Sequence, residues 1–301
     1  MRALLTRRKF LFGGALATAG TVIGADGYAE SNHPELKKIE ISLARLPQAF
    51  DGYRIVQLSD FHYENHFAAT PIRRAIEVVN SLKAELIVLT GDFVTAPIFG
   101  YRGPAARRAA DHAAPCAGLL QLLKGGEGTF AVLGNHDAAS DPMLVTKALE
   151  AHGITVLRNR AIPIERGSAR FWLAGTDDAL EGAADPDAAI AKVPSGEAVV
   201  LLAHEPDFAD TIATKPVDLQ LSGHSHGGQV WIPGIGAPWL PPLAKKYPRG
   251  LYRLHNLILY TNIGIGTIRA PIRLNAPPEI SLITLRAGAQ SRASQKNPNR
   301  L

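Results

Sequence analysis

Residues 222–229, SGHSHGGQ, place two histidines one residue apart in a stretch with three glycines. Such a stretch can be a polar turn, a proton relay, or one side of a metal site whose other ligands lie elsewhere. Imidazole is a common ligand of divalent transition metals. The positions of the other polar residues decide between these alternatives.

Five short apolar runs each end in a residue that can bind a metal. YRIVQLSDFH leads into Asp60 and His62, LIVLTGD into Asp92, TFAVLGNHD into Asn135 and His136, AVVLLAHEP into His204, and VDLQLSGHSH into His224 and His226. Continuous runs of Val, Ile and Leu are typical of strands that are buried on both faces of a sheet. Because α/β proteins bind ligands beyond the carboxyl ends of their strands, we expect these side chains to share one small volume.

The collected side chains combine imidazole, carboxylate and amide groups, a mixture that suits zinc, manganese or iron ions. Seven of them are candidate metal ligands: Asp60, His62, Asp92, Asn135, His204, His224 and His226. Seven ligands exceed the needs of one ion but suit two ions that share a bridging carboxylate. Such pairs, about 3.5–4 Å apart, hold the attacking and leaving oxygens of a displacement at phosphorus.

The spacing of the apolar residues predicts an α/β fold with two packed mixed β-sheets flanked by helices. Helical patterns occupy residues 71–83, 115–124 and 142–152, between the strand-like runs. Shorter runs separated by the turns ERGS and LHNL, within residues 154–177 and 251–285, predict antiparallel strands in a second sheet. Residues 95–114 form a long irregular stretch, which we interpret as a lid or binding loop.

The N-terminal residues resemble a twin-arginine export signal, in which Arg7 and Arg8 precede an apolar run. The run from Phe10 to Ala25 is short for a membrane span of about 20 residues, which favours a cleaved signal over an anchor. Cleavage is expected after Ala29, and an uncleaved tether is the alternative. We therefore expect the twin-arginine machinery as a partner and a periplasmic or other extracytoplasmic location, with possible tethering to the membrane.

Charge is concentrated at the two ends of the 301-residue chain. Of the net +5, residues 1–29 carry +3 and residues 286–301 carry +4, which leaves the body near −2. A body without excess positive charge argues against a nucleic-acid surface. We expect a signal or tether in residues 1–29, a linker in 30–38, one domain in 39–285 and a disordered basic tail in 286–301.

Two further expectations concern association. The basic tail could contact a membrane or the cell wall, and the protein is expected to be a monomer. The single cysteine, Cys116, excludes an internal disulfide and is expected to be buried.

The motifs D-x-H, G-D, G-N-H-D, a histidine after a strand and G-H-x-H, in this order, resemble the signature blocks of the calcineurin-like metallophosphoesterase superfamily. The segments KKYPRGLYRL and LYTNIGIGT resemble a branch of exported or membrane-tethered bacterial phosphodiesterases. The resemblance extends over about residues 39–285. It implies a hydrolase that acts on phosphoric ester bonds with two divalent ions.

The resemblance also implies roles for individual residues. One ion would be held by Asp60, His62, Asp92 and His226, and the other by Asp92, Asn135, His204 and His224. Asp92 would bridge the ions, a hydroxide shared by them would attack phosphorus, and His136 would donate a hydrogen bond or protonate the departing alkoxide. Arg249 and Arg102 are candidate substrate-binding residues, although YPRG at Arg249 could simply be a turn.

One position departs from the family pattern. Many relatives carry a second aspartate in the G-D block that orients the catalytic histidine, whereas this chain has Thr95. The carboxylate partner of His136, if it has one, must therefore come from elsewhere.

The implied function is hydrolysis of phosphodiester or pyrophosphate bonds in lipid- or nucleotide-linked substrates. UDP-2,3-diacylglucosamine is one such substrate of related hydrolases, although an export signal argues against this cytoplasmic-face compound. Phosphomonoesterase activity and a non-catalytic phosphate-binding role are the alternatives.

Overall fold

The protein is described by a computed structural model that covers residues 24–64, 67–97, 101 and 103–288. Three predictions fall on other residues: most of the export signal, the tail from residue 289, and the candidate Arg102. Among the described residues, no helix combines the length and the apolar character needed to cross a membrane.

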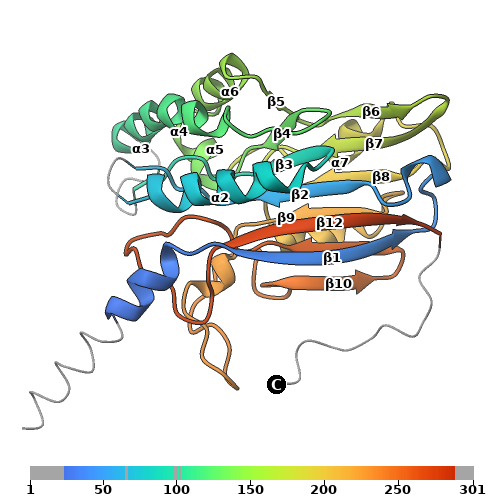
Figure 1. The fold of residues 1–301 in the computed structure, drawn as a ribbon. Coiled ribbons are helices and arrows are strands. Elements are labelled where there is room, and N and C mark those ends of the chain that lie inside the picture. Colours follow the sequence, from blue (N-terminus) through green and yellow to red (C-terminus); the bar gives the residue numbers. More distant parts are fainter. Residues whose placement is uncertain (1–23, 65–66, 98–100, 102, 289–301) are drawn as a thin grey trace, which may run out of the picture.

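The first sheet has six strands and is mostly parallel (Figure 1). Its order is β1 (Glu35–Leu43), β12 (Glu279–Ala287), β2 (Arg54–Leu58), β3 (Leu86–Thr90), β4 (Thr129–Val132) and β5 (Ile154–Val156). Strand β12 pairs parallel to β1 and antiparallel to β2, and β2 to β5 are all parallel.

The second sheet also has six strands. Its order is β10 (Gly250–Leu254), β11 (Leu257–Thr261), β9 (Leu219–Ser222), β8 (Val199–Leu202), β7 (Ala169–Gly175) and β6 (Arg160–Arg166). The four central strands are parallel, and only the two edge hairpins are antiparallel. The predicted pair of mixed sheets is confirmed.

The antiparallel strands expected in the second sheet form its two edge hairpins, whereas its centre is parallel. The turns ERGS and LHNL join only the edge hairpins β6–β7 and β10–β11. Strands β5 and β12, which lie in the stretches assigned to the second sheet, belong to the first. Tight turns reveal hairpins, whereas parallel pairing depends on distant segments that no local turn marks.

The three predicted helices are present as α2 (Ala69–Leu82), α4 (Ala113–Leu120) and α6 (Pro142–Ala151). The side chain of Asp141 caps α6 by accepting a hydrogen bond from the Leu144 amide. Short elements complete the fold: α3 (Pro104–Ala109), α5 (Asn135–Ser140), α7 (Pro186–Ile190), α8 (Ala209–Ile212), η1 (Gln48–Phe50), η2 (Ala110–His112), η3 (Pro206–Phe208) and η4 (His226–Gly228).

Three segments differ from the sequence predictions. The stretch 95–114, expected to be irregular, contains α3, η2 and the start of α4. The predicted linker 30–38 already contains the start of β1, because residues 35–38 pair with β12. At the other end, β12 extends to Ala287, two residues into the predicted tail.

Three apolar cores separate four layers in the order helix, sheet, sheet, helix. The first core joins β2–β5 to α2, α4 and α6, and includes the buried Cys116. The second lies between the two sheets, and the third joins the second sheet to α7 and α8. Strand β2 shows how one strand serves two cores, because Val56 faces the helices and Ile55 faces the other sheet.

The core between the sheets fixes the two halves of the molecule relative to each other. Phe171 of β7 is fully buried and packs edge-on against Phe50 at 5.0 Å and Tyr53 at 5.4 Å between ring centres. Near the strand ends, the Gln57 side chain donates to the Ser222 carbonyl of the other sheet at 2.8 Å. The carboxyl ends of β2, β3 and β4 therefore lie against those of β8 and β9.

Replacing Phe171 by alanine should lower the free energy of unfolding by about 3–5 kcal/mol, because it leaves a cavity between the sheets. Leu122→Ala, at a side chain that is 49% exposed, is the control and should change it by less than about 0.5 kcal/mol. Chemical denaturation at a fixed metal concentration measures both. Equal losses for the two variants would contradict this description of the core.

Candidate metal centre

The structure gathers all seven candidate ligands between the two sheet edges, and every one of them is buried. Asp60 and His62 follow β2, Asp92 follows β3 and Asn135 begins α5 after β4, while His204 follows β8 and His224 and His226 follow β9. Residues up to 166 positions apart in the chain thus share one volume, as the strand-end pattern predicts.

The first cluster consists of Asp60, His62 and His226. The Nε2 atoms of His62 and His226 lie 3.0 Å apart, and Nε2 of His226 is 3.4 Å from Oδ1 of Asp60. The candidate ligand atoms of the three residues all lie within 4.8 Å of one another. This spacing is compatible with one ion at their centre.

The second cluster consists of Asp92, His204 and His224. Nε2 of His204 lies 3.2 Å from Oδ2 of Asp92 and 3.2 Å from Nδ1 of His224. The same Oδ2 atom of Asp92 is 3.4 Å from Nε2 of His62 in the first cluster. The Asp92 carboxylate therefore lies between the clusters, where a bridging ligand would be placed.

The tautomers of two histidines are fixed by backbone carbonyls. Nδ1 of His204 is 2.6 Å from the Thr90 carbonyl, and Nε2 of His224 is 2.8 Å from the Pro242 carbonyl. A carbonyl only accepts hydrogen bonds, so each of these nitrogens carries its proton. In the neutral rings the lone pairs of the other two nitrogens face each other at 3.2 Å, and either a proton on His204 or a metal ion between the rings relieves this contact.

Asn135 provides a second, independent indication of a cation. Its Nδ2 donates to the Tyr101 hydroxyl at 2.5 Å. Its Oδ1 is buried and has no hydrogen-bond partner among the described residues. Leaving a buried acceptor unpaired costs about 1–3 kcal/mol, and a divalent ion would remove that cost.

The backbone at the site is strained. Five candidate ligands have left-handed φ angles: Asp60 at 53°, His62 at 44°, Asp92 at 57°, His224 at 69° and His226 at 51°. Non-glycine residues in this region each cost about 1–3 kcal/mol and persist only where the surroundings impose the conformation. The rigid buried strands impose it here, and the resulting sharp bends turn the side chains toward one point.

Two glycines permit the close approach of the strands. A Cβ atom on Gly134 would collide with Oδ1 of Asp92, and one on Gly223 would collide with Ser59 Oγ and Asp60 Oδ2. The glycines of the G-N-H-D and G-H-x-H motifs are therefore required by packing against the ligands themselves.

The ring of His136 is oriented by a backbone amide, and Thr95 stands where many relatives have a carboxylate for this purpose. The Ala96 amide donates to Nδ1 of His136 at 2.9 Å, so the neutral ring carries its proton on Nε2. Burial lowers the pKa of His136 to about 4, and the ring is therefore neutral near pH 7. Thr95 instead places its hydroxyl 3.3 Å from Nδ1 of His62.

Asp137 has a structural role. Its carboxylate accepts hydrogen bonds from the amides of Phe93, Val94 and Gly134 at 2.9–3.1 Å. These bonds tie the first turn of α5 to the loop after β3. They hold Asn135 and His136 in position without contact between Asp137 and a ligand cluster.

Arg273 is a positioning residue that the sequence analysis missed. Its side chain is fully buried and donates to the carbonyls of Gly266 at 2.6 Å, Ala276 at 2.8 Å and Ile263 at 3.0 Å. A longer bond of 3.4 Å reaches the carbonyl of His226. Arg273 thus joins the loop after β11 to the G-H-x-H motif, and no short motif identifies it in the sequence.

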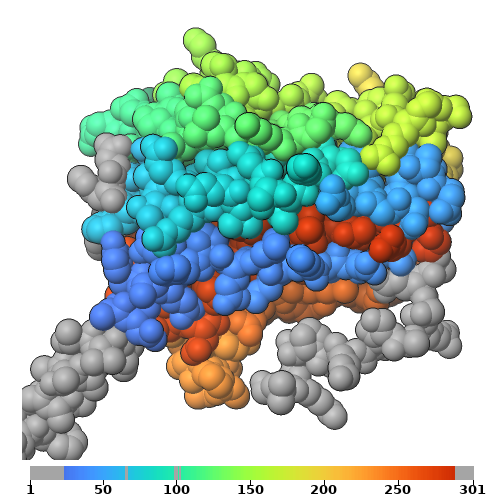
Figure 2. Space-filling model, viewed as in Figure 1, coloured from blue at the N-terminus to red at the C-terminus, as the bar shows by residue number. Residues whose placement is uncertain are grey.

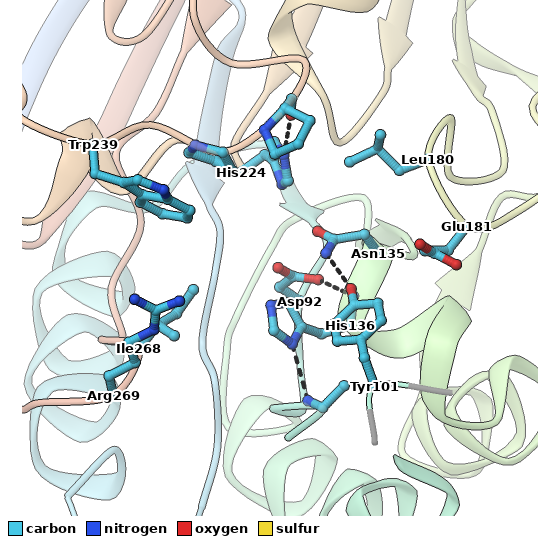
Figure 3. Close-up of a pocket in the computed structure, with 13 residues that line it drawn as sticks. Asp92, Tyr101, Asn135, His136, Leu180, Glu181, His224, Trp239, Ile268 and Arg269 are labelled. Carbon is cyan, nitrogen blue, oxygen red and sulfur yellow. Dashed lines mark hydrogen bonds between the residues drawn. The ribbon is translucent and has the colours of Figure 1, made fainter. Parts of the chain in front are cut away.

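A pocket of about 320 Å³ opens over the clusters. Figure 3 shows Trp239, Ile268 and Arg269 on one side of it and Asn135, His136 and Tyr101 on the other. Its remaining described lining residues are Asp92, Ala96, Leu180, Glu181, His224, Pro241 and Pro242. The pocket therefore has a polar floor at the clusters and largely apolar walls.

Of the two candidate substrate arginines, Arg249 does not line this pocket, and Arg102 lies outside the described residues. Arg249 stacks on Trp231, with its guanidinium carbon 3.7 Å from the ring centre, and is not among the lining residues. Arg269 lines the pocket instead, 5.4 Å from the centre of the Trp239 ring. Arg269 lies outside every sequence motif, so no pattern in the sequence identifies it.

Comparison with known proteins agrees with this geometry. A family model described as calcineurin-like phosphoesterase matches residues 53–228. The chain belongs to this family. It is therefore a hydrolase that acts on phosphoester bonds, and members of the family normally bind two divalent metal ions.

Relatives of similar length are known in bacteria. The chain is 35% identical to the metallophosphoesterase YkuE of Bacillus subtilis (strain 168) over 293 residues, which cover 94% of this chain and 98% of YkuE. It is 32% identical to the phosphodiesterase YaeI of Escherichia coli (strain K12), with 94% and 100% of the two chains covered. Among solved structures, the NAD nucleotidase NadN of Haemophilus influenzae aligns with a TM-score of 0.45 at 15% identity, over 71% of this chain and 45% of NadN.

Metal affinity should depend on pH through His204. Burial lowers the pKa of His204, but the nearby Asp92 carboxylate outweighs this effect and raises the pKa well above the ordinary 6.5. A metal ion must displace that proton, so the apparent association constant should rise about tenfold per pH unit below the raised pKa and level off above it.

Calorimetric titration of the metal-free protein with Zn²⁺ or Mn²⁺ between about pH 6 and pH 8 measures this slope. Buffers of different ionisation enthalpy report the number of protons released. An affinity independent of pH, with no proton release, would contradict a metal site at His204.

Proposed function

We propose that the protein hydrolyses phosphodiester or pyrophosphate bonds with two divalent ions at the two clusters. Asp60, His62, Asp92 and His226 would hold one ion, and Asp92, Asn135, His204 and His224 would hold the other. The unpaired Oδ1 of Asn135 supports this assignment most directly, because an ion satisfies it. The ligand types suit manganese, zinc or iron.

The bound ions would supply activation of water and neutralisation of phosphate charge. The Asp92 carboxylate contacts both clusters through Oδ2, which lies 3.4 Å from Nε2 of His62 and 3.2 Å from Nε2 of His204. Its Oδ1 accepts a hydrogen bond from the His136 amide at 2.9 Å. The carbonyls of Thr90 and Pro242 hold the rings of His204 and His224 in the tautomers that leave the ligand nitrogens unprotonated.

His136 acts as a hydrogen-bond donor through Nε2. Its Nδ1 is occupied by the Ala96 amide, so the ring cannot take up a second proton without losing that bond. A neutral donor at this place would bind a phosphate oxygen and stabilise charge that develops during displacement. Of the two roles implied for His136, hydrogen bonding therefore has more support than proton donation.

The apolar walls of the pocket favour a substrate with an organic group on each side of the phosphorus. Trp239, Ile268 and Leu180 line the space beside the polar floor. A phosphodiester or a pyrophosphate-linked compound fills such space, whereas a phosphomonoester leaves it to water. The relative YaeI, which is named a phosphodiesterase, agrees with this preference.

The natural substrate is proposed to be lipid- or nucleotide-linked, which an amphiphilic pocket can accept. UDP-2,3-diacylglucosamine belongs to this class. The proposed export by the twin-arginine pathway, with a periplasmic or membrane-tethered location, rests on the N-terminal sequence and points to a substrate outside the cytoplasm. The monomeric state and the lack of a nucleic-acid partner stay predictions.

Asp92→Asn should abolish both metal retention and hydrolysis, because it removes charge from the carboxylate shared by the clusters. Asp111→Asn, at an exposed aspartate in η2, is the matched control and should behave like the parent protein. Mass spectrometry of metal content, combined with hydrolysis of bis-p-nitrophenyl phosphate and p-nitrophenyl phosphate, tests both. We expect near two ions per chain and faster diester hydrolysis.

Three outcomes would overturn parts of this proposal. Faster hydrolysis of p-nitrophenyl phosphate would favour a phosphomonoesterase. Two ions without hydrolysis of either ester would favour a phosphate-binding protein. Full metal content and activity in Asp92→Asn would exclude the assigned centre.

His136→Ala should reduce kcat for the diester by about 10²–10³-fold while two ions stay bound, since the side chain donates to the substrate and not to an ion. His112→Ala, in η2, is the control and should retain kcat. Loss of metal together with activity in His136→Ala would show that His136 serves as a ligand.

A further inference from the structure

The segment 230–239, VWIPGIGAPW, exposes large apolar side chains on a projecting turn, and we call it the apolar loop. Ile232 is 38% exposed, Ile235 78% and Trp239 56%. Hydrogen bonds between the backbones of Ile232 and Gly236 close the tip, which makes the loop a defined turn. Single exposed apolar residues are ordinary, but three within eight positions indicate a contact surface.

The apolar loop lies beside the N-terminal helical residues 24–31 (Figure 2). Residues 270–276 lie between them and bind both. On one side the Trp231 amide donates to the Leu274 carbonyl at 2.8 Å, and on the other the Arg273 amide donates to the Gly27 carbonyl at 3.0 Å. The Glu30 carboxylate also accepts a hydrogen bond from the Ala276 amide at 2.8 Å.

The chain therefore reaches the folded body next to the apolar loop. The sequence that precedes residue 24 contains the apolar run that begins at Phe10. Ala29, the expected cleavage point, lies inside a helix whose residues bind the body, which favours the tether over a cleaved signal. A tether at this point would hold the apolar loop close to a bilayer.

Three arginines contact the apolar loop or the end of the N-terminal helical segment. Arg249 stacks on Trp231, Arg269 lies over Trp239, and Arg74 donates to the Asn32 carbonyl. Exposed Asp26 is an acidic residue in the same region. Aromatic side chains paired with arginine are typical of the water–bilayer interface, where the cation meets anionic headgroups.

The apolar loop also forms part of the candidate active site. Trp239 lines the pocket together with Pro241, Pro242 and Arg269. The exposed apolar surface is thus continuous with the apolar wall beside the metal clusters. A substrate that lies in a bilayer would reach the clusters along this wall.

We propose that the apolar loop docks into the interface of a bilayer that contains anionic lipid, and that the pocket takes an amphiphilic phosphoester from it. The docking surface is independent of the proposed function. The substrate class rests on the proposed function, because it requires hydrolysis at the clusters.

Quenching of tryptophan fluorescence tests the docking. The full chain is bound to vesicles of phosphatidylcholine and phosphatidylglycerol that carry brominated acyl chains, which quench only nearby rings. We expect quenching relative to unbrominated vesicles, and its loss in the double variant Trp231→Phe/Trp239→Phe, which removes both tryptophans of the apolar loop. Trp172, which is 9% exposed and packs in the third core, is the internal reference that stays unquenched.

Emission unaffected by bromine, in protein that floats with the vesicles, would overturn the proposal. It would show that a part of the chain other than the apolar loop holds it to the bilayer. Quenching that persists fully in the double variant Trp231→Phe/Trp239→Phe, whose remaining tryptophan is Trp172, would equally exclude the apolar loop as the contact.

A comparison of two diesters tests the delivery of substrate. The double variant Ile232→Asp/Ile235→Asp should lower hydrolysis of hexadecyl p-nitrophenyl phosphate in vesicles by about tenfold or more, because aspartate is costly to bring into a bilayer. Hydrolysis of soluble bis-p-nitrophenyl phosphate should stay unchanged, since neither isoleucine lines the pocket. Leu144→Asp, at an exposed leucine on α6, is the control and should retain both activities.

The outcomes separate this proposal from the proposed function. Unchanged hydrolysis of both diesters, or an equal loss of both, in the double variant would overturn delivery from the bilayer. If the parent protein hydrolyses neither diester, the proposed function and the substrate class fail together, and the quenching result still decides the docking.

Discussion

The structure depends on a buried repulsion between two histidine rings that a proton or a bound metal ion relieves. Nε2 of His204 and Nδ1 of His224 face each other at 3.2 Å in a buried site, and backbone carbonyls hold the protons of both rings on the opposite nitrogens. The Asp92 carboxylate beside them supplies negative charge but no proton of its own. A divalent ion satisfies the facing lone pairs and the carboxylate at once, which is why these buried polar groups can coexist.

The remainder of the fold makes that arrangement rigid. Strands buried on both faces leave little freedom at their ends, so they can impose left-handed angles on ligands such as Asp60 and His226. Each sheet carries part of the site, and the apolar core between the sheets sets the distance between the parts. Arg273 adds a charged link by binding the carbonyls of several loops near the G-H-x-H motif. Binding of ions would in turn stabilise the folded chain, since the unfolded chain has no such site.

Much of the site could be predicted from the sequence because the signal is local. An apolar run followed by Asp, Asn or His marks both a strand and the residue at its end, and parallel strands bring their ends to one edge. The strand order could not be read in the same way, since β12 inserts between β1 and β2 from the far end of the chain. The hydrogen-bond partner of His136 could not be predicted either, because it is the backbone amide of Ala96 and not a side chain. Arg249 was a candidate for contact with the substrate, and its guanidinium stacks on Trp231.

We expect two ions to share Asp92 between the two sheets. Anomalous diffraction from crystals grown with Mn²⁺, recorded on both sides of the manganese absorption edge, locates them. Two peaks are expected: one among Asp60, His62, Asp92 and His226, and the other among Asp92, Asn135, His204 and His224. Crystals with no peak at these residues, or with one ion that leaves Asn135 without a ligand contact, would contradict this expectation.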